Sequence, residues 1–141
     1  MSIIKGYTDI EQSRKLAEFL PYESADMEYI LEQWIDEKTY RHKEAFCEIP
    51  VVKVEDDCPL QPITLDCWSL AALLSLLPNN EHIETTISRG SWKIDTIEYL
   101  PNTWWCEYED NESLTEFNTS ADNPIDACVE MIVKLHELNL L

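Results

Sequence analysis

The predicted fold depends most on residues 104–118, which read WWCEYEDNESLTEFN. Aromatic residues give residues 104–109 and 114–118 the composition of β-strands, and the polar pair Asp110-Asn111 between them favours a turn. We therefore expect two neighbouring antiparallel strands in this part of the chain.

The preceding residues extend this sheet. β-Branched and aromatic residues recur in 83–87 and 92–99, on either side of Arg89-Gly90, which predicts a β-hairpin with its turn at these two residues. Pro101-Asn102 predicts another turn before residue 104. Together these segments predict an antiparallel meander of about four strands.

A helix is predicted over residues 124–138, after the meander. Asn123 can serve as its N-cap, Pro124 suits the first helical position, and Asp126 favours the positive end of the helix dipole. We expect one face of this helix to pack on the sheet and the last leucines to dock behind it. That face comprises Ile125, Cys128, Val129, Ile132, Leu135 and His136, and the last leucines are Leu138, Leu140 and Leu141.

A central helix is predicted to begin after Asp66, whose carboxylate can cap it, and to end at Pro78. Leucines recur along it at helical spacing, and its other faces are mostly apolar as well. A helix that is apolar around most of its circumference belongs in the core, so we expect it to be buried. The leucines are Leu70, Leu73, Leu74 and Leu77, and the other faces carry Trp68, Ala71, Ala72 and Leu76.

The N-terminal part is predicted to be helical. Thr8 and Glu11 have the spacing of a capping box, which predicts a helix over about 9–20 that ends at Pro21. Residues 27–35 repeat apolar side chains at helical spacing and predict another helix, although their tyrosine, isoleucines and tryptophan also suit a strand.

The residues before the central helix are predicted to be extended. Residues 46–54 have the composition of a short strand, which Pro50 confines to a sheet edge or a bulge. Residues 55–62 are polar and contain two prolines, which favours a loop.

Length and composition favour one globular α+β domain spanning residues 1–141. Hydrophobic residues make up 45% of the chain, which is too many for an acidic disordered tail. A chain of 141 residues is also long enough to bury a single core. The predicted fold is therefore a meander with a buried central helix, a C-terminal helix on the sheet and an N-terminal helical part.

The net charge excludes several classes of partner. The chain has 28 Asp and Glu against 10 Lys and Arg, which gives a net charge of −18. Such a charge disfavours direct binding to nucleic acids or acidic membranes. The longest nearly apolar run, residues 68–77, is about half the length that a bilayer requires. The N-terminus lacks the features of a secretory signal, so we expect a cytoplasmic protein.

Neither a cofactor nor a metal ion is predicted. Gly6 and Gly90 are the only glycines, too few for a phosphate-binding glycine-rich loop. The cysteines lack the paired spacing of zinc ligands, and the carboxylates lack the register of an EF-hand. In a reducing compartment we expect most thiols to lie in the core. The cysteines are Cys47, Cys58, Cys67, Cys106 and Cys128.

An enzymatic alternative depends on Cys67 or on a pair of carboxylates. Cys67 follows the predicted cap Asp66, where a helix dipole would favour a thiolate, but the Asp66 charge opposes this. No sequence feature places a histidine beside Cys67, and 28 acidic residues make some close carboxylate pair inevitable. A structural subunit of a larger complex is a further alternative.

The favoured function is binding of a basic protein. Between Lys93 and Lys134 the chain has ten carboxylates and no basic residue, which predicts a sustained negative surface potential. Trp104 and Trp105 must face opposite sides of a strand, so one of them can anchor a partner. The expected partner-binding residues are Trp104, Trp105, Glu107, Glu109, Asp110, Glu112 and Glu116.

This hypothesis has a sharper form and an alternative. In the sharper form the protein is a nucleic-acid mimic, whose carboxylates replace phosphates on the surface of a nucleic-acid-binding protein. In the alternative the acidic face only keeps the protein soluble.

Three stretches carry a family resemblance: GYTDIEQSRKLAEFLP (6–21) with ESADM (23–27), CWSLAALLSLLP (67–78) and SADNPIDACVEMIVKLH (120–136). They resemble a group of small acidic proteins of unknown function that gut bacteria, their phages and other mobile elements encode. The resemblance implies an intracellular accessory protein of a mobile element, and it offers no catalytic residue to carry over to this chain. It also favours an inhibitor, because mobile elements often encode acidic proteins that occupy the DNA-binding surfaces of host defence proteins.

Overall fold

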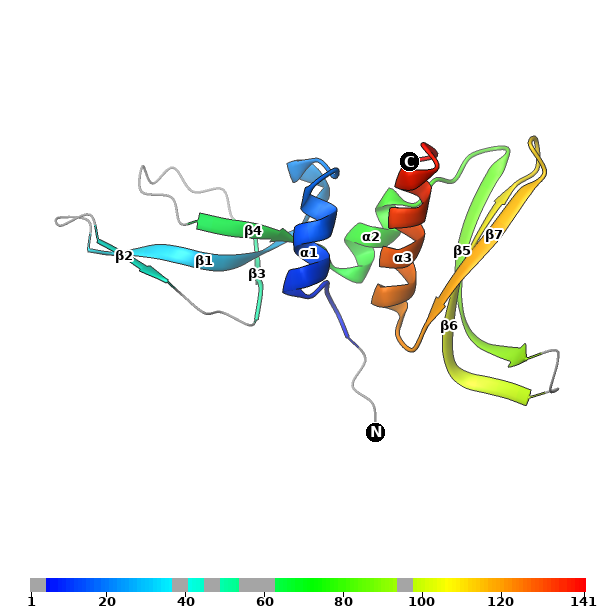
Figure 1. Cartoon of the computed structure of the whole chain (residues 1–141), viewed down its shortest axis with the longest axis horizontal. Helices are drawn as coiled ribbons and strands as arrows, with labels where there is room; N and C mark the ends of the chain where they lie inside the picture. The colour runs from blue at the N-terminus through cyan, green and yellow to red at the C-terminus, as the bar shows by residue number, and fades with distance from the viewer. Residues whose placement is uncertain (1–4, 37–40, 45–48, 54–62, 94–97) are drawn as a thin grey trace. The chain divides into compact units, whose positions relative to one another are not determined.

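The computed structural model describes residues 5–36, 41–44, 49–53, 63–93 and 98–141. Within these ranges it contains three α-helices and seven strands with antiparallel pairing, which confirms the predicted α+β class. The chain divides into two compact units (Figure 1). One comprises Asp9–Ser69, and the other comprises Met1–Thr8 together with Leu70–Leu141.

The larger unit is built on a three-stranded antiparallel sheet in the order β5-β6-β7. Its strands are β5 (Ile83–Lys93), β6 (Glu98–Asp110) and β7 (Thr115–Ala121), so consecutive strands are neighbours in the sheet (Figure 1). A meander is thus present, with three described strands where about four were expected.

The two turns predicted at Arg89-Gly90 and Pro101-Asn102 were wrong, because both pairs lie inside long strands. Gly90 has a φ of 86°, and the pairing register shifts between Arg89 and Ser91, as at a β-bulge. The Arg89 Nε donates to the carbonyl oxygen of Pro101 at 3.2 Å across this irregularity. The connection between β5 and β6 falls on residues 94–97, outside the described residues.

The predicted turn at Asp110-Asn111 is confirmed. One Asp110 carboxylate oxygen accepts from the backbone N–H groups of Glu112 at 2.9 Å and Ser113 at 3.3 Å. Leu114 adopts a φ of 58° before β7 begins at Thr115. Strand β7 (Thr115–Ala121) begins one residue later and ends three residues later than the predicted strand 114–118.

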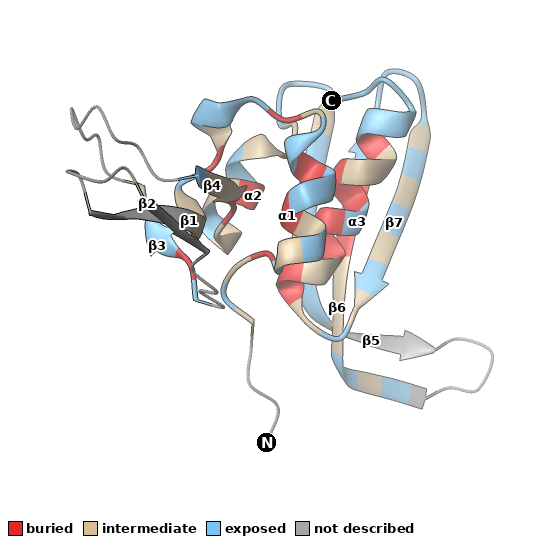
Figure 2. Cartoon of the chain, turned by 60° about the vertical axis from the view of Figure 1, so that its left-hand side comes forward, coloured by how far each residue is buried: buried red, intermediate tan, exposed pale blue. Residues whose placement is uncertain are grey.

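The C-terminal helix α3 (Pro124–Glu137) begins as predicted. The Asn123 side chain accepts from the backbone N–H of Asp126 at 2.8 Å, and Pro124 occupies the first turn. The helix packs on β6 and β7, and the Thr119 hydroxyl donates to the carbonyl oxygen of Ala127 at 2.8 Å (Figures 1 and 2). Its buried residues include Ile125, Cys128, Val129, Ile132 and Leu135.

The end of α3 differs from the prediction. His136 is exposed although we placed it on the buried face, and Leu138 and Leu141 are about half exposed and not docked. Asn139 has a φ of 57°, and the N–H of Leu140 bonds the carbonyl oxygen of Leu135 at 2.8 Å. This left-handed residue ends the helix, and the N–H of Leu140 satisfies one of its last carbonyl oxygens.

The central helix α2 (Leu70–Leu76) is shorter and more exposed than predicted. It packs against α3 and buries Leu73, whereas Leu74 is 38% exposed. Asp66 does not cap it, because Asp66 lies within a strand of the smaller unit and pairs with Lys53. Helix α2 is therefore stabilised by its packing against α3 and not by an Asp66 cap.

The smaller unit begins with α1 (Ile10–Ala17), which contains a capping box one residue later than predicted. Asp9 accepts from the N–H of Gln12 at 2.7 Å, and the Gln12 side chain accepts from the N–H of Asp9 at 3.1 Å. Thr8, the predicted cap, is buried. After Pro21 a single 3₁₀ turn, η1 (Tyr22–Ser24), leads into the sheet.

The helix predicted over 27–35 was wrong: these residues form β1 (Met27–Asp36). This strand pairs with β2 (Arg41–Glu44), β3 (Val51–Val52) and β4 (Ile63–Cys67). β-Branched and aromatic side chains suit a strand once partner strands are present, and a helical spacing of apolar residues does not reveal those partners. Of the predicted strand 46–54, residues 49–53 are described, and β3 lies within them. The predicted loop 55–62 lies outside the described residues.

Aromatic and aliphatic side chains form the core of this unit. Helix α1 contacts β4, and the Trp68 indole N–H donates to the Ser24 hydroxyl at 3.0 Å. The Ser69 N–H and hydroxyl both donate to the Asp26 carboxylate, which ties the entry of β1 to the end of the unit. The buried hydrophobic residues described in this unit include Leu16, Leu20, Ala25, Tyr29, Cys67 and Trp68.

Replacement of Gly90 by alanine should destabilise the protein by about 1–2 kcal/mol, because an L-residue is strained at a φ of 86°. The added Cβ would also meet the Tyr99 hydroxyl, although that exposed side chain can move aside. Urea unfolding measures the loss. Gly6→Ala is the control, since a Cβ there meets no atom within 4 Å. Equal stabilities of the two variants would contradict the assigned bulge.

Candidate functional site

Helix α3 packs on one face of the β5-β6-β7 sheet. Alternate residues of the three strands point to this α3 side, and Thr85, Cys106 and Tyr108 are buried there. Figure 1 shows α3 on that side of the sheet and no described element of the same unit on the other. We call this other side the outer face. It carries Glu84, Thr86, Ser88, Trp105, Glu107, Glu109, Glu116, Asn118 and Ser120.

Three glutamates lie in one row across the outer face. The pairing register places Glu84 opposite Glu109, and Glu109 opposite Glu116. Directly opposed residues in antiparallel strands have Cβ atoms about 4.5–5.5 Å apart, and like charges at that distance are destabilising. All three side chains are exposed, so water screens this repulsion without removing it.

The neighbouring rows continue the acidic character and add an aromatic ring. Glu107 lies between Thr86 and Asn118, and Trp105 lies between Ser88 and Ser120. None of the nine described residues of the outer face is basic. The Trp105 indole is half-buried, and its buried N–H has no hydrogen-bond acceptor among the described residues. The outer face thus combines a carboxylate row with a half-buried Trp ring.

Two of the predicted residues lie on the α3 side of the sheet. Trp104 pairs with Arg89 and Ala121, and the Arg89 guanidinium carbon lies 5.9 Å from the Trp104 ring centroid. The two adjacent tryptophans therefore lie on opposite faces, as the alternation of a strand predicts. Asp110 pairs with Ile83 and directs its carboxylate into the β6-β7 turn.

The Asp110 carboxylate is held in its charged form. A hydrogen bond from the Ser113 side chain lowers the pKa of Asp110 below its ordinary value of 3.8, and burial opposes this shift. The backbone N–H groups of Glu112 and Ser113 and the charge of the nearby His82 lower the pKa further. Glu112 is 74% exposed in the same turn, with a carboxylate oxygen 3.9 Å from His82 Nε2. These groups stabilise the turn at the acidic end of the sheet.

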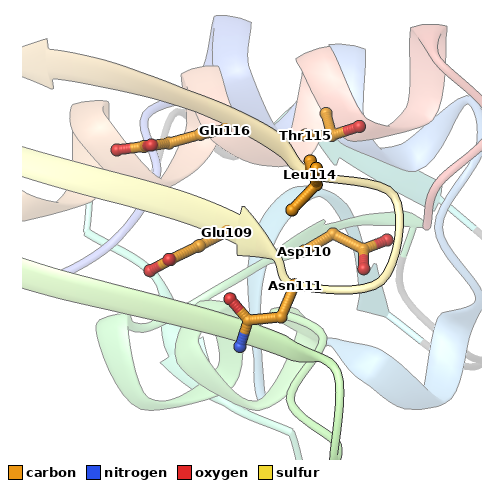
Figure 3. Close-up of a pocket in the computed structure, with 6 residues that line it drawn as sticks. All are labelled: Glu109, Asp110, Asn111, Leu114, Thr115 and Glu116. Carbon is orange, nitrogen blue, oxygen red and sulfur yellow. The ribbon is translucent and has the colours of Figure 1, made fainter.

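A small hollow lies beside this turn (Figure 3). Its volume is about 110 Å³, and Figure 3 shows Glu109 and Glu116 extending from their strands in the same direction. A hollow of this size holds a few water molecules, whereas small-molecule sites usually measure about 300–1,000 Å³. The hollow is therefore too small for a typical small-molecule site. Its lining residues are Glu109, Asp110, Asn111, Leu114, Thr115 and Glu116.

Glu84 completes the carboxylate row and was missed by the sequence interpretation. A hairpin turning at Arg89-Gly90 would have paired residues 83–87 with 92–99 and so separated Glu84 from Glu109. The observed register comes from the longer strand β5. The alternation of Glu84, Thr86 and Ser88 was an available signal for one polar face.

The described cysteines are buried. Cys67 is fully buried at the end of β4, three residues before α2 begins, so it does not occupy a helix N-terminus as the enzymatic alternative required. Cys106 and Cys128 are free and fully buried as well, which confirms the core prediction for these three. Cys47 and Cys58 lie outside the described residues.

The described ranges contain neither a cluster of metal-ligand side chains nor a helix that could span a membrane. Among these residues no three or more His, Cys, Asp or Glu side chains gather as a metal ion would need. No helix in the same part of the chain has the length and apolar character to cross a bilayer.

Comparison of the chain with protein-family models, curated proteins and solved structures found no match. The function proposed below is therefore inferred from the geometry of the outer face. The resemblance to acidic proteins of mobile elements stays a prediction.

The Asp110 hydrogen bonds predict a pH-dependent contribution to stability. Because the folded protein lowers the pKa of Asp110, its carboxylate stabilises the fold above the ordinary value of 3.8, and this contribution is lost as the pH falls below that value. Asp110→Ala should therefore be less stable than the parent at neutral pH, with a gap that narrows on acidification. Urea titrations across this range measure the gap. Asn111→Ala is the control, because Asn111 lies in the same turn and has no titratable group. If the stability difference between Asn111→Ala and the parent changes with pH in the same way, the pH dependence does not come from Asp110.

Neutralising the middle of the carboxylate row should stabilise the protein. Glu109→Gln removes both like-charge contacts, with Glu84 and with Glu116, and should raise the unfolding free energy by about 0.5 kcal/mol at low salt. The gain should shrink as salt rises from about 0.01 M to about 1 M, because the Debye length falls from about 30 Å to about 3 Å. Glu130→Gln, on the exposed side of α3, is the matched control. A gain that salt does not change would exclude repulsion as its cause.

Proposed function

We propose that this chain is a non-enzymatic protein-binding module whose outer face docks on the basic surface of a nucleic-acid-binding protein. The observation that carries this proposal is the row of Glu84, Glu109 and Glu116 across the outer face. In the sharper form of the proposal the carboxylates replace phosphates and the protein acts as a nucleic-acid mimic.

The charge arrangement supports a partner better than it supports solubility alone. Solubility requires charged side chains, and surfaces that serve it usually mix both signs. Opposing Glu109 with glutamates on both neighbouring strands costs stability in the free protein. A cationic surface turns this cost into a favourable interaction on binding, because it neutralises all three carboxylates together.

The spacing of the outer face suits arginine-rich and lysine-rich surfaces. Neighbouring strands are about 4.8 Å apart and alternate residues of one strand about 6.8 Å apart, so Glu107, Glu109 and Glu116 offer closely spaced anions. A guanidinium can bind a carboxylate through two hydrogen bonds. Trp105, one row further, offers a ring on which an arginine can stack, and Trp is common among the anchor residues of interfaces.

The family resemblance supports the same proposal. A mobile element that encodes an acidic protein able to occupy a host DNA-binding surface would protect itself from that host protein. In this proposal the protein acts in the cytoplasm, where thiols such as those of Cys67 and Cys106 remain reduced.

Affinity capture with matched variants tests the proposal. The wild-type protein is immobilised, exposed to host lysate at low salt and eluted with rising salt, and the eluted proteins are identified by mass spectrometry. One variant carries Glu84→Gln, Glu109→Gln and Glu116→Gln. The control carries Glu11→Gln, Glu18→Gln and Glu130→Gln, which removes the same charge from exposed positions elsewhere.

The wild type and the control should retain a basic nucleic-acid-binding protein that leaves at moderate salt, whereas the outer-face variant should bind it at least about tenfold more weakly. Duplex DNA in excess should displace it if the protein is a mimic. Equal retention by both variants, or elution that salt does not affect, would contradict the assigned surface. If the protein retains a basic protein that DNA does not displace, the docking proposal stands and the nucleic-acid-mimic form of it is excluded.

A further inference from the structure

Two thiols face each other inside the larger unit. Cys106 lies in β6 and Cys128 in α3, and neither side chain has any exposed surface. Both are free thiols. The outer-face proposal uses neither of them, so their arrangement is an independent feature of the fold.

The helix approaches the sheet closely at this point. Cys106 is paired across the strands with Thr119, and the Thr119 hydroxyl donates to the carbonyl oxygen of Ala127 at 2.8 Å. Ala127 is the residue before Cys128, so this bond fixes the α3 backbone directly over the strand pair that contains Cys106. Helix α3 packs on β6 in the same unit. Disulfides require Cα separations of about 4.4–6.8 Å, so a bridge between these two residues would require the helix and strand backbones to approach that closely.

The two thiols are also chemically unequal. The Cys128 thiol donates a hydrogen bond to the Cys106 sulfur, which lowers the pKa of Cys106 against the effects of burial and of the Glu107 charge. The same hydrogen bond, together with burial, strongly raises the pKa of Cys128. In the pair proposed below, Cys106 is the attacking thiol and Cys128 the resolving thiol.

We propose that Cys106 and Cys128 form a redox-active pair that a hydroperoxide converts to a disulfide linking β6 to α3. A hydroperoxide is the class of oxidant that the site favours, because a fully buried thiol admits a small molecule during local opening more readily than a bulky disulfide.

The chemistry requires one equivalent of hydrogen peroxide. The Cys106 thiolate attacks one peroxide oxygen, the O–O bond breaks, and the departing hydroxide takes up a proton, which leaves a sulfenic acid on Cys106. The Cys128 sulfur then attacks the Cys106 sulfur and displaces the sulfenic oxygen as water, with the Cys128 proton going to that oxygen. The two thiols lose two electrons and two protons in total, and the peroxide gives two molecules of water.

The distribution of basic residues allows a direct assay. No lysine or arginine occurs between Lys93 and Lys134, so trypsin releases residues 94–134 as one peptide whose only cysteines are Cys106 and Cys128. The native protein is treated with hydrogen peroxide, alkylated under denaturing conditions, digested and weighed. The peptide should be two hydrogen atoms lighter than its reduced form and should resist alkylation until a thiol reductant is added.

Three controls accompany the assay. Cys67→Ser should give the same bridged peptide, because the third buried thiol takes no part. Cys128→Ser should give a peptide that gains oxygen on Cys106, because no thiol is present to resolve the sulfenic acid. The urea-unfolded protein should give a smaller share of the bridged peptide, because all five cysteines then compete.

The oxidised protein should also melt about 10 °C higher, and a thiol reductant should reverse the shift, because a bridge across 22 residues restricts the unfolded chain. The proposal is overturned if peroxide leaves both thiols of the peptide free while the other cysteines oxidise. A bridge that forms equally well in the folded and unfolded protein would also overturn it, since sequence separation alone would then explain the pairing.

Discussion

The packing of α3 on β6 and β7 is the interaction on which the larger unit depends. Fully buried side chains from both elements meet there, among them Ile132 and Leu135 of the helix and Tyr108 of the sheet, and each contributes roughly 1.5–3 kcal/mol of hydrophobic stabilisation. The Thr119 to Ala127 hydrogen bond fixes the contact at one point. A one-residue slip of β6 would turn Glu107 and Glu109 toward the helix, so the burial of this face specifies the register.

The same register determines what the other face presents. Because strand residues alternate, fixing Cys106 and Tyr108 toward α3 sends Trp105, Glu107 and Glu109 outward. The register that buries Cys106 and Tyr108 is therefore sufficient to place the three glutamates in one row on the outer face. The Tyr108 hydroxyl is buried and has no hydrogen-bond partner within the described part of the chain, and burial together with the Asp110 charge raises the pKa of Tyr108. Its ring stacks on Phe117 at 4.7 Å, with the Lys134 ammonium 4.7 Å from the Phe117 ring centroid.

Strand β6 therefore carries both features proposed here, on opposite sides. Cys106 lies between Trp105 and Glu107 in the sequence and faces the helix, whereas its two neighbours face solvent. A disulfide between Cys106 and Cys128 would link β6 to α3 on the buried side of the sheet and would not alter the carboxylates of the outer face. The outer face and the thiol pair can thus be tested separately in one protein.

Sequence alone determined the elements that local interactions stabilise. Asn123-Pro124 predicted the start of α3, Asp110-Asn111 predicted the turn before β7, and the alternation of strand residues predicted that Trp104 and Trp105 face opposite sides. In each case the residues that form the stabilising contact lie within a few positions of each other. The ten carboxylates between Lys93 and Lys134 also indicated an acidic surface from the sequence alone.

Tertiary structure decided the rest, because strands bond to partners that are remote in sequence. Residues 27–35 have a helical spacing of apolar side chains, yet β1 is a strand because β4, more than 30 residues away, pairs with it. Gly90 resembles a turn residue, yet β5 continues through it because β6 is long enough to pair with both of its halves. That pairing alone brings Glu84 beside Glu109. Helix hydrogen bonds close within one turn and can be inferred locally, whereas sheet register depends on which distant segments bury a face together.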